Sequence, residues 1–267
     1  MKSAQPKYTF YNKPLTIFIT DIYNVCRFIL RFFAEVFRPP YEFRETIRQC
    51  YNVGYKSLAL VSLTGFITGV VFTKQSRPSL AEFGATSWLP GLIAIAIIRA
   101  LAPLITSLIV AGKVGSNIGA ELGSMKVTEQ IEAMEVSATN PFKFLVVSRV
   151  VATTIMTPML VSYMAFVGLL GAYLNVHQHE NTSFAAFFQH GFSSISFLDV
   201  FSSLFKSVVY GFTVGITGCY QGFTVEKGTQ GVGKAANTAV VISMFMIFIE
   251  EMIIVQVVNQ IRPAYVH

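Results

Sequence analysis

Long apolar runs separated by short polar stretches dominate the sequence after about residue 55. The runs cover residues 55–73, 89–111, 144–176, 200–223 and 236–261. A helix needs about 20 residues to cross roughly 30 Å of hydrocarbon, so each run is able to span a membrane once. The pattern predicts an all-α integral membrane protein with about five transmembrane helices.

An amphipathic pattern precedes the first run. Residues 15–36 carry apolar side chains at a spacing of three or four, which forms one stripe on a helix. Charges such as Asp21, Arg27 and Arg31 favour a position in the membrane interface over a crossing. Pro39 and Pro40 end this helix, and a second short amphipathic piece follows.

These patterns divide the chain into two regions. We expect residues 1–54 to form a cytoplasmic, interfacial region of amphipathic helices, and residues 55–267 to form a five-span membrane domain. Basic side chains in the first region suit the anionic cytoplasmic leaflet.

Residues 112–141 interrupt the apolar pattern with charged side chains. A charge at the bilayer centre costs at least about 2.5–3.5 kcal/mol, so we expect this segment to lie outside the membrane. Val127, Ile131 and Met134 recur at a helical spacing and predict one apolar stripe. Such a helix either rests on lipid headgroups or enters a groove of a partner protein. Its many glutamates disfavour anionic lipid and favour a basic groove.

The same segment, GKVGSNIGAELGSMKVTEQIEAMEVSATNP, resembles the signature of MlaE-family permeases, the membrane subunits of ABC lipid transporters that work with MCE proteins. The resemblance extends from about residue 55 to the C-terminus. It implies that residues 112–141 hold a cytoplasmic coupling helix that docks on the ATPase subunit. The residues assigned to that coupling are Glu121, Lys126, Glu129, Ile131, Glu132, Met134 and Glu135.

The resemblance also implies function and partners. It predicts a homodimeric permease that moves phospholipid, or a similar amphiphile, between the bacterial inner membrane and a periplasmic MCE-protein assembly. A cytoplasmic STAS-type accessory subunit is a further partner that the family allows. No cofactor is expected on this chain, since ATP and Mg²⁺ would bind the ATPase.

Composition and charge agree with a membrane protein. Apolar residues make up 53% and charged residues 13% of the chain, against about 25% charged in soluble domains. Lysine and arginine concentrate in the N-terminal region and in the segments after the second and fourth runs. The positive-inside rule therefore places the N-terminus and residues 112–141 in the cytoplasm and the C-terminus in the periplasm. Residues 177–197 become an external loop.

Four charged residues fall inside the runs, namely Arg99, Lys206, Glu250 and Glu251. Such residues either form structural ion pairs or line a substrate pathway. The resemblance associates the positions of Arg99, Lys206 and Glu251 with a lipid cavity between two permease copies. The family commonly reads Arg-Glu-Leu-x-Pro where this chain has Ala100 after Arg99, so we expect Glu250 or Glu251 to pair with the arginine.

Three other patterns have simpler interpretations. Residues 228–235 nearly match a phosphate-binding loop, but Ala235 replaces the required Ser or Thr. Two histidines and a glutamate at residues 177–180 suggest incidental polarity more than a metal site, and no metal is predicted. Gly115, Gly119 and Gly123 predict tight helix packing.

The main functional alternative is a secondary transporter or channel that uses the intramembrane Arg, Lys and Glu residues for ion coupling. Five spans without inverted repeats weaken that alternative. An intramembrane enzyme is disfavoured because no HExxH or GxSxG motif occurs in a span.

Overall fold

The computed structural model describes residues 13–180, 182–225 and 228–261, and every regular element within them is a helix. This confirms the all-α prediction. The chain divides into two compact units, Met1–Tyr41 and Glu42–His267. The predicted periplasmic C-terminus falls partly on residues 262–267, which lie outside the described residues.

The first unit contains helix α1 (Lys13–Val36), which agrees with the predicted amphipathic helix over residues 15–36. Apolar side chains such as Ile22, Tyr23 and Leu30 are exposed along it. Its position in the membrane interface stays a prediction.

Among the residues that the structure describes, the second unit contains five helical stretches that are long and apolar enough to cross a membrane, as the sequence predicted. The first is Phe43–Glu82, formed by α2 (Phe43–Val53), the turn η2 (Tyr55–Ser57) and α3 (Leu58–Glu82). The second is Thr86–Val127, formed by η3 (Thr86–Trp88), α4 (Leu89–Ala96), η4 (Ile97–Leu101), α5 (Ala102–Val110), η5 (Ala111–Gly115) and α6 (Ser116–Val127).

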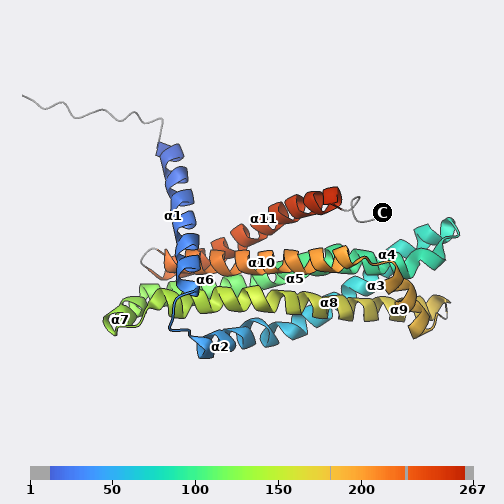
Figure 1. Ribbon diagram of the computed structural model, residues 1–267, viewed down its shortest axis with the longest axis horizontal. Helices are drawn as coiled ribbons and strands as arrows, with labels where there is room; N and C mark the ends of the chain where they lie inside the picture. Colours follow the sequence, from blue (N-terminus) through green and yellow to red (C-terminus); the bar gives the residue numbers. More distant parts are fainter. Residues whose placement is uncertain (1–12, 181, 226–227, 262–267) are drawn as a thin grey trace, which may run out of the picture. The chain divides into compact units, whose positions relative to one another are not determined.

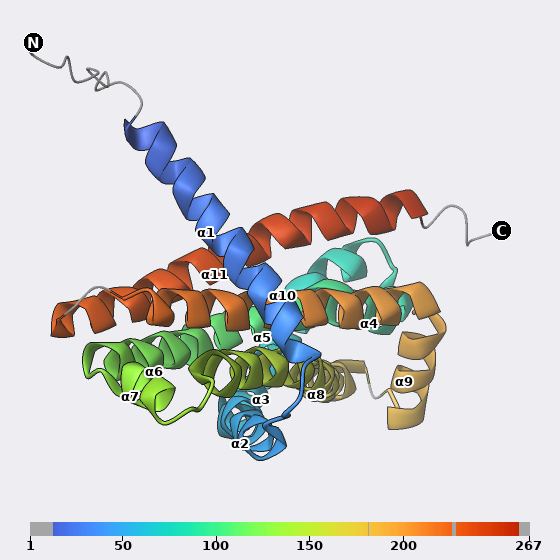
Figure 2. The ribbon, with the colours of Figure 1, turned by 60° about the vertical axis from the view of Figure 1, so that its left-hand side comes forward.

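The short helix α7 (Gln130–Val136) separates the second stretch from the third. The third is Phe142–Glu180, formed by η6 (Phe142–Val147) and α8 (Ser148–Glu180). The helix α9 (Phe184–Ser193) follows, and α10 (Phe197–Phe223) and α11 (Thr229–Ile261) complete the unit. Figures 1 and 2 show α7 at one end of this helical bundle and α9 at the other.

Residues 112–127, the first part of the segment predicted to lie outside the membrane, continue the helix of the second stretch. Their position relative to the membrane stays a prediction. Ile118 and Leu122 are buried in this part of the helix, because α6 packs against α10 and α11. Gly119 allows this approach, since an added Cβ would lie 3.2 Å from the Ala235 backbone oxygen. The predicted tight packing of the glycines is therefore confirmed at Gly119.

Helix α8 forms the centre of the bundle, with α3 and α10 packed extensively along it. Glycines permit both contacts. A Cβ on Gly69 of α3 would lie 1.9 Å from the Gly168 backbone oxygen. On α10, a Cβ on Gly211 would lie 2.6 Å from the Thr153 backbone oxygen. Helices in lipid gain little from apolar burial, so this close approach supplies the packing that holds them together.

The predicted external loop is also partly helical. Residues 177–180 form the last turn of α8, where His177 and His179 Nδ1 atoms lie 2.9 and 2.8 Å from the Thr182 and Asn175 backbone oxygens. Glu180 pairs with Arg77 at 3.5 Å. Among the described residues no group of three His, Cys, Asp or Glu residues is able to hold a metal ion.

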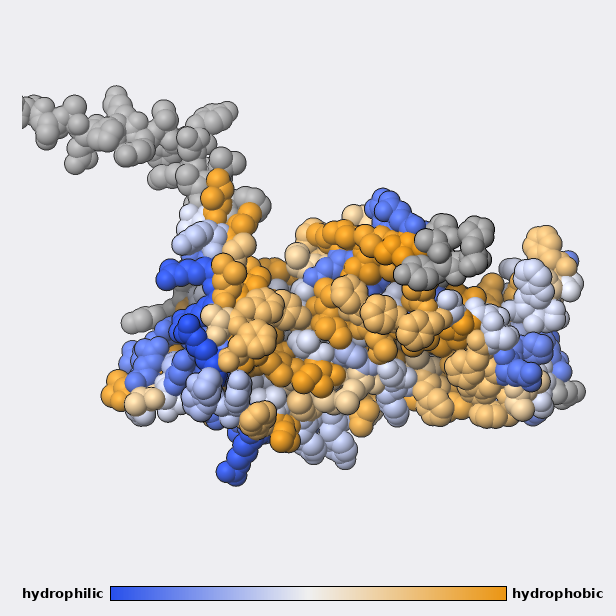
Figure 3. Space-filling view, viewed as in Figure 1, coloured by the Kyte–Doolittle hydropathy of each residue, from blue (hydrophilic) through white to orange (hydrophobic). Residues whose placement is uncertain are grey.

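One face of the molecule shows the surface expected for a protein in a bilayer. Hydrophobic side chains cover the middle of this face, over α10 and α11, and hydrophilic ones gather at the end that holds α9 (Figure 3). Exposed apolar residues of α11 include Phe245, Phe248 and Met252. The chain is therefore a multi-pass membrane protein.

The contact between α3 and α8 gives a prediction for stability. Gly69→Ala should destabilise the protein by about 1–3 kcal/mol or more. The added methyl group would clash with the Gly168 backbone oxygen, which cannot move aside by changing a side-chain rotamer. Thermal unfolding in detergent measures this. Gly233→Ala in α11 is the control, since nothing lies within 4 Å of its Cβ position. Equal unfolding temperatures for the two variants would contradict the packing account.

Candidate functional site

A stripe of polar side chains runs along α10, through the middle of the bundle. It contains Asp199, Ser203, Lys206, Tyr210, Thr213 and Thr217, at alternating spacings of four and three. Most of these side chains are buried, so α10 turns a polar face toward its neighbouring helices. Sequence reasoning identified only Lys206, although the helical spacing of the other polar residues was visible in the sequence.

A buried ion pair connects α10 to α11. Lys206 is 1% exposed, and its Nζ donates to Glu251 Oε1 at 2.7 Å. The Tyr210 hydroxyl donates to the other oxygen of Glu251. The Lys206 charge is therefore compensated, as a buried charge must be.

Arg99 lies beside this pair, on the π-helical turn η4. Pro103 has no N–H group to donate to the Arg99 carbonyl four residues earlier, so a regular α-helical bond is missing there. Lys206 Nζ donates to that carbonyl oxygen at 3.4 Å. The proline and the lysine together explain why the helix departs from α geometry at this position.

The partners of Arg99 differ from the expectation. We expected Glu250 or Glu251 to pair with it, but its guanidinium instead lies 3.9 Å from Asp199 Oδ1 and donates to Asn259 Oδ1. Glu251 is already held by Lys206. Asp199 is fixed in place because its other oxygen caps α10, accepting from the Ser196 N–H at 3.1 Å.

Glu250 has a separate contact. Its Oε1 accepts from the Thr213 hydroxyl at 2.6 Å, while its buried Oε2 has no hydrogen-bond partner among the described residues. Both glutamates therefore face α10. The structure brings three of the four predicted intramembrane charges together around Lys206, and places Glu250 beside them, in contact with Thr213.

An apolar groove of about 480 Å³ lies between α10 and α11, and its described lining residues are uncharged. Two of them, Ser202 and Ile254, are four and three positions from Lys206 and Glu251, about one helical turn away. The walls of the groove include Phe201 and Phe205 of α10 and Ile254 and Val257 of α11. It exists because α11 diverges from α10 toward residue 261 (Figures 1 and 2). An apolar groove one helical turn from a buried ion pair is suited to an amphiphile whose chains occupy the groove and whose polar group reaches toward the pair.

The second candidate region is α7 and its flanks. The predicted apolar stripe of Val127, Ile131 and Met134 is interrupted, because the chain leaves the helix at Thr128 and Glu129. Glu129 adopts a left-handed conformation (φ 60°), which separates Val127 on α6 from the other two residues. The prediction of a single stripe is therefore wrong.

The side chains of α7 divide between its inner and outer faces. Ile131 was expected to enter a partner groove, but it is 2% exposed within this chain. Met134 is half-buried, and Lys126 forms an ion pair with Glu132. Glu129 and Glu135 are exposed, and Val136 is 90% exposed. Val136 is thus a large exposed apolar side chain of this region, which sequence reasoning missed.

Glu121 forms an ion pair within its own chain. Its carboxylate lies 2.9 Å from Nη2 of Arg149, a residue of α8 that is 2% exposed. Arg149 Nη1 also donates to the Leu145 backbone oxygen at 2.9 Å. The pair joins α6 to α8 at the base of the α7 region. Arg149 was not identified from the sequence, because its position near the start of a run resembles an ordinary interfacial arginine.

Most of the near-match to a phosphate-binding loop, residues 228–235, is helical in the structure. Gly233, Lys234 and Ala235 lie within the helix α11. A phosphate-binding loop instead wraps its backbone N–H groups around the phosphates before the helix begins.

Comparison with known proteins gives the family. The model of the permease MlaE family matches residues 46–257. A protein of Rickettsia typhi named as a probable ABC transporter permease is 35% identical over 85% of this chain and 88% of its own. A permease of the same description from Synechocystis is 38% identical, over 77% of this chain and 78% of its own.

A plant relative is more distant. The chloroplastic protein TRIGALACTOSYLDIACYLGLYCEROL 1 of Arabidopsis thaliana is 32% identical over 79% of this chain and 60% of its own. The family match covers most of the second compact unit, including the polar stripe of α10, the residues around Lys206 and α7. This chain belongs to the MlaE family of ABC transporter permeases.

Proposed function

We propose that this chain is the permease subunit of an ABC transporter that moves phospholipid, or a similar amphiphile, between the bacterial inner membrane and a periplasmic MCE-protein assembly. ATP hydrolysis would reside in a separate ATPase subunit, as membership of an ABC permease family implies. Two copies of the permease would form a homodimer. A cytoplasmic STAS-type subunit is a further proposed partner.

The observation that carries the proposal is the Lys206–Glu251 pair, which lies about one helical turn along α10 and α11 from the apolar groove. A phospholipid needs an apolar surface for its acyl chains and a cation for its phosphate. Both are present between α10 and α11. The Arabidopsis relative supports a lipid substrate, since it is named after a glycerolipid.

The geometry suggests how a headgroup would be bound and released. A buried cation must keep an anionic partner, because leaving it uncompensated costs about 3–5 kcal/mol. A phosphate that approaches Lys206 replaces the carboxylate of Glu251 as that partner, and Tyr210 still donates to the freed carboxylate. When α10 and α11 return together, Glu251 displaces the phosphate.

Coupling to ATP would act through α7. This helix follows directly on the second stretch, which is helical from Thr86 to Val127 and carries Arg99. A displacement of α7 would therefore be transmitted to the second stretch, the helix that carries Arg99. We assign the outer contact to Glu129, Glu135, Met134 and Val136. Ile131, Lys126 with Glu132, and Glu121 with Arg149 hold the region in place.

The first test replaces the buried pair as a unit. In Lys206→Met with Glu251→Gln no buried charge is left unpaired, so folding should be near normal. Phospholipid that co-purifies and lipid transfer in proteoliposomes should both fall at least tenfold, because the cation for the phosphate is gone. The control is Arg77→Gln with Glu180→Gln, which removes an ion pair whose residues do not line the groove. Normal transfer by the first double variant would mean that the pair is only structural.

The second test concerns α7. Val136→Ser and Glu135→Lys should each weaken ATPase binding by about 1–2 kcal/mol, and the charge reversal should lose its effect at high salt. Retention of the ATPase on affinity-tagged permease measures this. Glu82→Lys makes the same charge change on an exposed residue at the end of α3. Full retention of the ATPase by both α7 variants would remove α7 from the interface.

The third test concerns orientation. After Cys26, Cys50 and Cys219 are replaced by serine, Ser183→Cys should react with an impermeant thiol reagent added outside the cell. Ser124 is also exposed and lies toward the α7 end, so Ser124→Cys should react only after the membrane is opened. Outside labelling of Ser124→Cys would reverse the proposed topology.

A further inference from the structure

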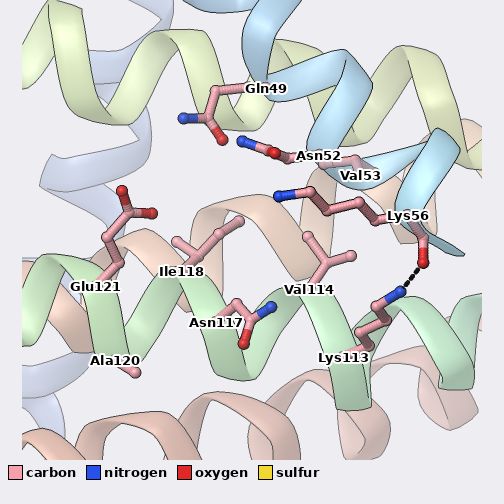
Figure 4. A pocket seen from close by; sticks show the side chains of 10 residues that line it. All are labelled: Gln49, Asn52, Val53, Lys56, Lys113, Val114, Asn117, Ile118, Ala120 and Glu121. Atoms are coloured by element: carbon pink, nitrogen blue, oxygen red, sulfur yellow. Dashed lines mark hydrogen bonds between the residues drawn. The ribbon is translucent and has the colours of Figure 1, made fainter.

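A polar cavity lies between α2 and α6, away from the groove of α10 and α11. Its volume is about 510 Å³, and the charges on its walls are Lys56, Lys113 and Glu121. Figure 4 shows the Lys56 ammonium and the Asn52 and Gln49 amides reaching into the space between the two helices. The remaining walls include Val53 and Ile118. None of the functions assigned above uses this cavity.

The walls of the cavity carry more positive than negative charge. Glu121 is the single acid on its walls, and that carboxylate is already paired with the buried Arg149 at 2.9 Å. Lys113 Nζ donates to the backbone oxygen of Lys56, which brings two lysines from different helices to one side of the cavity. The Lys56 ammonium has no hydrogen-bond or ion-pair partner among the described residues. The cavity therefore presents an excess positive charge and unpaired donors.

We propose that this cavity binds the phosphate of an anionic phospholipid of the cytoplasmic leaflet, as a site separate from the transport groove. Lys56 and Lys113 would supply the charge, and Asn52 and Asn117 would donate to the phosphate oxygens. Lys56 precedes α3 and Lys113 lies in η5, so both occur where the spans approach the α7 end of the bundle. With the proposed orientation, this is the level of the anionic headgroups.

The size and chemistry of the cavity favour a headgroup over a bare ion. A volume of about 510 Å³ is in the range of small-molecule sites and far exceeds a single phosphate. The apolar residues Ile47, Tyr51 and Tyr55 lie on another side of α2 and η2, where they line a separate apolar pocket against α8. A lipid bound in the polar cavity would connect α2 to α6 and thereby fix the first span against the helix that leads to α7.

Native mass spectrometry of the detergent-purified full chain tests the proposal. The probe is dioctanoyl phosphatidylglycerol, compared with dioctanoyl phosphatidylcholine and with inorganic phosphate. We expect Lys56→Gln with Lys113→Gln to bind one phosphatidylglycerol fewer per chain than the unmodified protein, with affinity for that lipid at least tenfold weaker. Phosphatidylcholine and inorganic phosphate should bind the unmodified protein at least tenfold more weakly than phosphatidylglycerol.

The controls separate this site from charge in general and from the transport groove. Lys74→Gln with Lys234→Gln removes the same charge from exposed positions outside the cavity and should keep the lipid. Lys206→Met with Glu251→Gln should also keep it, so failure of the transport site leaves this result unaffected. Asn117→Asp, which adds a negative charge to the cavity without touching a lysine, should lose the lipid even if the lysine variant folds poorly.

Three outcomes would overturn the proposal. Unchanged phosphatidylglycerol binding in both the lysine variant and Asn117→Asp would show that the cavity is not the site. Equal binding of phosphatidylcholine would show that charge plays no part. Displacement of the lipid by inorganic phosphate of comparable affinity would show that the cavity recognises a free anion.

Discussion

A charge buried in a membrane protein must have a compensating charge beside it, and this constraint organises the bundle around Lys206. The lysine reaches Glu251 on α11 and the carbonyl of Arg99 on η4, so a single side chain joins three segments that are far apart in sequence. Pro103 leaves that carbonyl without its usual donor. In the proposed mechanism, an anion that pairs with Lys206 takes the place of Glu251.

Glycine contacts pack the helices on one side of this charge cluster tightly together. The helix on the other side, α11, is packed less tightly. Gly69 and Gly211 let α3 and α10 approach α8 until backbones touch, so these helices have little room to shift. Helix α11 is different, since it diverges from α10 and leaves an apolar groove. The Lys206–Glu251 pair therefore joins a firmly packed helix to one that is less enclosed, which places any movement at the groove.

The sequence predicted the number of membrane helices, because apolar length is a property of the chain alone. It also predicted that Arg99, Lys206, Glu250 and Glu251 lie within apolar helices, since charges in apolar runs are rare. It failed where neighbours decide the outcome. Ala100 suggested that a glutamate would pair with Arg99, but Asp199 occupies that position as a result of helix packing.

The α7 region shows the same limit. The spacing of Val127, Ile131 and Met134 fits one helix, yet the chain breaks at Glu129 and turns Ile131 inward. A periodic pattern does not reveal which face is covered by another part of the same chain. The buried partner of Glu121, Arg149, was hidden for that reason: the two residues are adjacent only after α6 packs near α8.

An electron cryomicroscopy map of the complex, purified with its ATPase and with native lipid, tests the central claim most directly. The account predicts phospholipid density in the groove between α10 and α11, with the headgroup within hydrogen-bonding distance of Lys206 Nζ and with Glu251 displaced from it. A well-resolved map in which lipid lies elsewhere and the Lys206–Glu251 pair stays closed in every state of the ATPase would contradict the account.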